Sequence, residues 1–139
     1  MQVTKAMGLA LWVLAGTSIA ADAPFTGTFS GTGRACSGGL YLRAKTVEWI
    51  STYSICKPSR YELLAKDLAV DHQRIAVRIK TRSSQCRYEV FEAEQVSTYS
   101  WDVRGYQSLE AYRKQDQPEW RNSALPERLS LSCPMVRLN

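Results

Sequence analysis

Glu92 and Glu94 form the first pair of residues whose types and spacing could do chemistry. A spacing of two places both side chains on one face of a β-strand, and two carboxylates flank the reacting bond in glycoside hydrolysis. Arg74, Arg78 and Arg87 are cations that can face them from neighbouring segments. We therefore interpret the two glutamates as a solvated ladder of opposite charges, and a secreted hydrolase using this carboxylate pair is kept as an alternative.

Other catalytic patterns do not occur in the sequence, which has no G-x-S-x-G, P-loop, H-E-x-x-H or Gly-rich dinucleotide turn. The single histidine, His72, lies between two predicted strands, and we interpret it as a solvated turn residue. One histidine and no C-x-x-C pair also argue against a metal site. The sequence therefore predicts no catalytic residue, no metal and no cofactor.

Trp120 and Arg121 are the candidate partner-binding residues. They lie in the polar, proline-containing segment 116–126, which we predict to be a long loop. A tryptophan beside an arginine is a typical composition of an interaction hot spot, and long loops are often functional. The alternative is that Trp120 folds back and plugs one end of the domain.

Four cysteines, Cys36, Cys56, Cys86 and Cys133, predict two disulfides if the chain is exported. Four cysteines allow three pairings, and the sequence does not choose among them. We favour Cys36 with Cys56, because they are close in sequence, and Cys86 with Cys133, which would tie the last strand to a central one.

Export is indicated by the first residues. Lys5 precedes an uncharged apolar run, 6–16, and small residues follow up to Ala20, which is the pattern of a secretory signal. The run is too short to span a bilayer. We predict a cleaved signal peptide over residues 1–20, a single domain over 21–139, and a periplasmic or extracellular location with no stable membrane anchor. A retained membrane anchor or a buried helix is the competing interpretation.

The charge of the predicted mature chain is mildly basic. Removing Lys5 lowers the 18 basic residues to 17, against 13 acidic residues, which gives a net charge of about +4. This balance favours an acidic partner or an anionic surface weakly. It does not predict a nucleic-acid-binding protein.

Period-two alternation of apolar and polar residues predicts strands along most of the chain. The clearest segments are 74–80 and 129–135, and shorter ones occur at 40–44, 47–49, 61–65 and 99–103. The segment 86–96 changes phase, which predicts a bulge near Val90. Lys57-Pro58-Ser59 is predicted to be a turn.

One short helix is predicted at 108–115, with Ser108 as its N-cap and Leu109 and Tyr112 on one face. The fold prediction is therefore an all-β, mainly antiparallel domain, a small barrel or sandwich of about seven or eight strands with one short helix and two disulfides. Gly27-Thr28-Phe29 is similar to the G-x-W start of lipocalin-like barrels, with Phe in place of Trp. No later motif of that family follows, so no residue role is carried over.

These features together predict an exported, non-catalytic binding domain. A protein partner is favoured, as for an inhibitor or an immunity factor, because of Trp120 and Arg121. A small apolar ligand held in a barrel mouth is the alternative partner.

Overall fold

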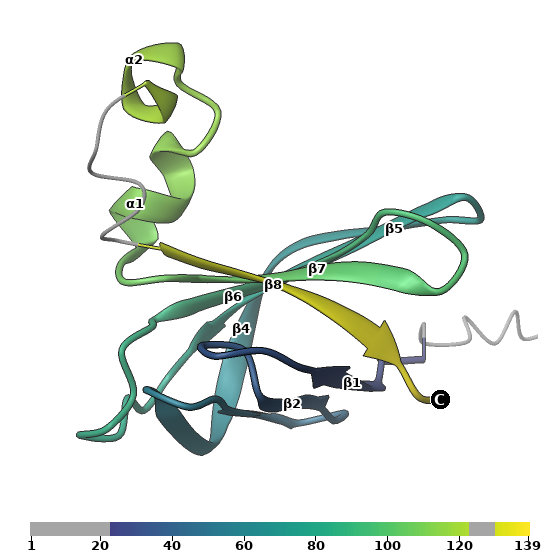
Figure 1. The fold of residues 1–139 in the computed structure, drawn as a ribbon, viewed down its shortest axis with the longest axis horizontal. Coiled ribbons are helices and arrows are strands. Elements are labelled where there is room, and N and C mark those ends of the chain that lie inside the picture. The colour runs from purple at the N-terminus through teal and green to yellow at the C-terminus, as the bar shows by residue number, and fades with distance from the viewer. Residues whose placement is uncertain (1–22, 123–129) are drawn as a thin grey trace, which may run out of the picture.

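The computed structural model describes residues 23–122 and 130–139, and it is a closed barrel of eight antiparallel strands (Figure 1). Each strand pairs with the next along the chain, and β8 pairs with β1 to close the barrel. The all-β prediction is confirmed, and the barrel form is the correct one of the two predicted. The strands are β1 Gly27–Gly31, β2 Gly38–Leu42, β3 Thr46–Ile50, β4 Ile55–Ala69, β5 His72–Ile79, β6 Val90–Gln95, β7 Ser100–Tyr106 and β8 Ser130–Arg137.

The inner face of the barrel is filled by large side chains. Phe29, Trp49, Phe91 and Trp101 are each no more than 2% exposed. Gly105 lies opposite Phe91 in the register, and a Cβ atom there would come within 2.6 Å of Tyr88 and 2.7 Å of Trp49. For much of the barrel the apolar phase of the sequence forms this dense core as predicted. At 61–65 and 99–103 the predicted phase is wrong in part, because Leu63 is 49% exposed and Tyr99 is 79% exposed.

The long strand β4 corrects the turn predicted at Lys57-Pro58-Ser59. These residues lie within β4, where the register to β3 shifts between the pairs Val47–Ser59 and Trp49–Cys56. A proline cannot donate to the ladder, and bulges are the places where a sheet tolerates one. The register shift therefore lets β4 continue through Pro58.

The bulge predicted near Val90 is also wrong, because β6 begins at Val90 and no register shift occurs between β5 and β6. Residues 86–89 form a loop whose Tyr88 ring stacks on Trp49 with centroids 5.5 Å apart. Val90 is buried on the outer face and Phe91 on the inner face. Both phases are apolar because a second layer covers the outer face at this point.

Two disulfides form, and both differ from the favoured pairing. Cys36 bonds to Cys133, and Cys56 bonds to Cys86. The barrel closure explains the first bond, because Gly31 of β1 pairs with Met135 of β8 and brings the β1–β2 connection to the last strand. Two intramolecular disulfides are typical of proteins in an oxidising compartment.

The helix predicted at Ser108 is confirmed as α1, Leu109–Lys114, whose first turn is capped by Ser108 Oγ accepting from the Ala111 amide at 3.0 Å. A second helix, α2 (Pro118–Arg121), corrects the loop prediction, since Pro118 begins it at a position where helices accept proline. Residues 123–126 of that predicted loop, and the predicted signal peptide over 1–20, lie outside the described residues. Among the described residues, no helix is long and apolar enough to cross a membrane.

Candidate binding site

The connection between β7 and β8, residues 107–129, is the longest in the barrel and carries both helices. Figure 1 shows α1 and α2 beyond the end of β7, away from the β4–β5 and β6–β7 hairpins. Val90, Tyr106 and Ala111 are buried between α1 and the outer face of the barrel. Leu64, Leu109, Tyr112 and Trp120 pack around them. This second cluster fixes the helices on the barrel.

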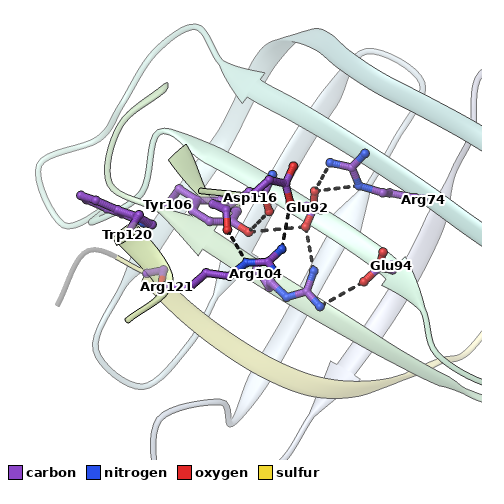
Figure 2. A pocket seen from close by; sticks show the side chains of 10 residues that line it. Arg74, Glu92, Glu94, Arg104, Tyr106, Asp116, Trp120 and Arg121 are labelled. Carbon is purple, nitrogen blue, oxygen red and sulfur yellow. Dashed lines mark hydrogen bonds and ion pairs between the residues drawn. The ribbon is translucent and has the colours of Figure 1, made fainter. Parts of the chain in front are cut away.

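A cavity of about 480 Å³ lies beside this second cluster, between the outer face of the sheet and the helical connection. Side chains from β5, β6 and β7 form one wall, and the connection forms the other (Figure 2). The lining residues are Arg74, Glu92, Glu94, Arg104, Tyr106, Gln115, Asp116, Trp120, Arg121 and Ser130.

Glu92 is the innermost charge of this cavity, with a side chain only 1% exposed. Its Oε2 accepts from Arg74 Nε at 2.9 Å and Arg74 Nη2 at 2.6 Å, and its Oε1 accepts from Arg104 Nη1 at 2.8 Å. A buried carboxylate needs such partners because its desolvation is costly. The prediction that Glu92 is solvated is therefore wrong, and Arg78, one of its predicted partners, binds Glu89 instead.

Glu94 lies two residues further along β6 and is held from both sides. Arg104 Nη2 donates to its Oε1 at 3.0 Å, and His72 Nε2 lies 3.2 Å from its Oε2. Burial works to raise the pKa of Glu94, but the hydrogen bond and charge of Arg104, followed by those of His72, hold this pKa below its usual value. His72 is exposed, as the sequence predicts, but it is the first residue of β5 and pairs with Ala69 of β4, so its assignment to the turn between strands is wrong.

Arg104 links the whole charged wall, because it also reaches Asp102 at 3.2 Å. Burial disfavours its charged form, yet the hydrogen bonds to Glu92 and Glu94 raise the pKa of Arg104 above its usual value. Burial, and next the charge of Glu92, raises the pKa of Tyr106. The Tyr106 hydroxyl therefore stays protonated at neutral pH, and it donates to Gln115 Oε1 at 2.6 Å.

Trp120 and Arg121, the two residues predicted from sequence, both line this cavity where α2 borders it, and we call this part of the cavity the rim. Their side chains extend in different directions, with the Arg121 guanidinium directed toward Asp116 (Figure 2). The Trp120 ring is half-buried against the second cluster, and Lys114 Nζ lies 5.5 Å from its centroid. Arg121 donates to the Gln115 carbonyl at 2.9 Å and to Asp116 Oδ1 at 3.1 Å, with 63% of its side chain exposed. Trp120 covers the outer face of the sheet, whereas the barrel interior is filled by other rings.

The predicted pairing of Arg74 with the glutamates is confirmed for Glu92, but Arg104 and Tyr106 were not singled out from the sequence as members of a site. A usable signal is present, however, because charges of opposite sign recur with period two on the outward phase of three consecutive strands. Arg74 on β5, Glu92 on β6 and Arg104 on β7 are the central members of that pattern. Opposite charges on neighbouring strands are expected to pair.

Glu92 and Glu94 are better suited to holding the neighbouring arginine side chains in place than to acting as general acids. A general acid requires a carboxyl group whose pKa is raised, whereas the pKa of Glu94 is lowered. Both oxygens of Glu92 already accept from guanidinium groups. The four cysteines are all disulfide-bonded, and the described residues contain no group of ligands that could hold a metal ion.

No family model matches the chain, and neither the curated proteins nor the solved structures give a match.

Proposed function

We propose that this chain is an exported, non-catalytic binding domain that recognises a protein partner through the rim of the cavity beside α2. The observation that carries the proposal is the position of Trp120 and Arg121, which both line a charged cavity of about 480 Å³. Aromatic and arginine side chains around a pocket are typical of the energetic centre of protein interfaces.

The rim is also preorganised, which lowers the entropy lost on binding. Trp120 packs against a buried cluster, and the Arg121 guanidinium is fixed by the Gln115 carbonyl and by Asp116. The cavity beneath has a charged wall whose groups already neutralise one another. Such a wall can accept a polar side chain of a partner without leaving an unpaired buried charge.

A protein partner is favoured over a small apolar ligand because neither the barrel interior nor the cavity outside the barrel is suited to an apolar ligand. The barrel interior is occupied by Trp49, Trp101, Phe29 and Phe91. The cavity outside the barrel is lined mainly by charged and polar groups, whereas sites for small apolar ligands are lined predominantly by apolar ones.

The proposal also includes export of the chain from the cytoplasm. The two disulfides support an oxidising compartment, and the pattern of residues 1–20 supports a signal peptide that is removed on export. We place the mature domain in the periplasm or outside the cell.

The test is affinity capture from the native extracytoplasmic fraction with four immobilised proteins. The mature wild type is compared with Trp120→Ala, Arg121→Ala and the control Tyr99→Ala, which removes a 79% exposed ring at the opposite end of β7. The proposal predicts a protein that is captured by the wild type and by Tyr99→Ala, and that is lost from both rim variants. Equal capture by all four proteins, or turnover abolished by Glu92→Gln with Glu94→Gln in a folded protein, would contradict it.

A further inference from the structure

A second cavity, of about 380 Å³, lies where β4 changes its partner strand. Residues 55–60 of β4 pair with β3, and residues 61–69 pair with β5. The cavity is lined by Ala44, Lys45, Arg60, Tyr61 and Lys80. Three of these five residues are cations, and they come from three separate segments: the β2–β3 turn, β4 and the end of β5.

The three cations have no counter-charge within the described part of the chain. None of them takes part in an ion pair there, whereas the neighbouring Arg43 is paired with Glu48 at 3.5 Å. Glu62, the next acidic residue along β4, does not line the cavity. Three like charges around one concave surface repel one another and raise the local potential for anions.

The backbone holds these cations in place. The Tyr61 hydroxyl donates to the carbonyls of Arg43 at 2.8 Å and Ala44 at 3.2 Å, which fixes the turn that carries Lys45. The Lys80 amide donates to the Arg60 carbonyl at 2.8 Å, which fixes the other two cations relative to each other. The fold therefore brings the three segments that carry these cations to one cavity.

We propose that this cavity binds a phosphate or sulfate group, a tetrahedral oxyanion that offers several oxygens to the three cations. Arg60 supplies a planar fork of donors that matches two oxygens of such a group, and Lys45 and Lys80 act as point charges on the others. A carboxylate has only two oxygens, which lie in one plane, and so cannot meet cations that come from three separate segments as a tetrahedral group can. This site is separate from the rim beside α2 and does not depend on the proposed partner.

The test is a titration of the mature chain, followed by amide chemical shifts at constant ionic strength. Inorganic phosphate, inorganic sulfate and acetate are the probes. The proposal predicts saturable shifts at residues 44–46, 60–61 and 80 with phosphate or sulfate, and no saturation with acetate. Shifts that saturate equally with acetate, or that are absent at these residues, would overturn it.

Variants separate this site from general surface charge. Arg60→Gln should weaken phosphate binding about tenfold or more, because a charge-assisted bidentate pair is lost. Arg60→Lys should weaken it less, and the control Arg113→Glu, an exposed cation on α1, should leave it unchanged. Equal weakening by Arg60→Gln and Arg113→Glu would overturn the proposal. A parallel melting curve confirms that each variant is folded.

Two further binding experiments identify the kind of molecule that supplies the phosphate or sulfate group. Sulfated polysaccharide and vesicles containing phosphatidylglycerol are each tested for binding that competes with inorganic phosphate and is lost in Arg60→Gln. Competition by one of them assigns the group to a glycan or to a lipid headgroup. Binding of inorganic phosphate alone assigns the site to the free ion. Polymer or vesicle binding that persists in Arg60→Gln and leaves the shifts of residues 44–46 unchanged would contradict the site.

Discussion

Replacing Glu92 by glutamine tests whether the buried charge network stabilises the fold. Removing one partner of a buried ion pair costs about 3–5 kcal/mol of unfolding free energy when the remaining charge is fully buried. Arg74 and Arg104 keep 32% and 26% of their side-chain exposure, so water can partly replace the lost carboxylate. We therefore expect a loss of about 2–3 kcal/mol, below the fully buried limit.

The assay is chemical unfolding at pH 7, with melting temperature as a second readout. For a domain of this size the expected loss corresponds to a decrease of about 8–12 °C. The matched control is Glu48→Gln, which breaks a longer and less buried pair with Arg43, 3.5 Å apart with 52% of the arginine side chain exposed, and should cost less than about 1 kcal/mol. If Glu92→Gln is no more destabilising than Glu48→Gln, the network does not support the fold and the reasoning is refuted.

Three further predictions follow from the core, the charged wall and the disulfides. Gly105→Ala should destabilise the fold by about 1–3 kcal/mol, because its Cβ would overlap Tyr88 and Trp49, and a melting curve with no shift would contradict this. Because the pKa of Glu94 is lowered in the folded protein, the ionised carboxylate stabilises the fold above the ordinary pKa of 4.5, and this stabilisation is lost as the pH falls through the lower folded pKa. Urea midpoints measured downward from pH 5 should therefore fall less steeply for Glu94→Gln than for the wild type. Parallel slopes for the two proteins would argue against this contribution of Glu94. Replacing both cysteines of the Cys36–Cys133 bond by serine should cost roughly 1 kcal/mol more than the same change at Cys56–Cys86, because the separations are 97 and 30 residues, and the reverse order would speak against the entropic argument.

The disulfide pairing itself can be read from an unreduced tryptic digest, since trypsin places the four cysteines in four different peptides. The peptide that contains Cys36 should be joined to the one that contains Cys133. A Cys36–Cys56 link would show that the barrel closure is described wrongly.

The barrel could be predicted from the sequence to the extent that one face of each strand is apolar. Val77 and Ile79 alternate with Arg78 and Lys80, and the structure places both apolar residues in the core. Capping chemistry at Ser108 located α1 for the same reason, because the signal is local. Pairing between distant segments is not local. Cys133 meets Cys36 only because β8 closes on β1, and no spacing in the chain encodes that closure.

The candidate site could be predicted only in part. Trp120 and Arg121 stood out by composition, and the structure brings them to one rim. Glu92 was assigned to solvent because alternation identifies the outer face of a strand but not what covers it. Its cover comes from a connection further along the chain, which was predicted as a helix but not placed in space.

The central claim, that the rim beside α2 binds a protein partner, is tested most directly by the affinity of the captured partner for Trp120→Ala. Titration calorimetry with the wild type, Trp120→Ala and the Tyr99→Ala control, at a temperature where all three are folded, supplies this number. The account predicts a dissociation constant about 30-fold higher for Trp120→Ala, equivalent to about 2 kcal/mol, and an unchanged value for Tyr99→Ala. A dissociation constant that is the same for Trp120→Ala and the wild type would contradict the account.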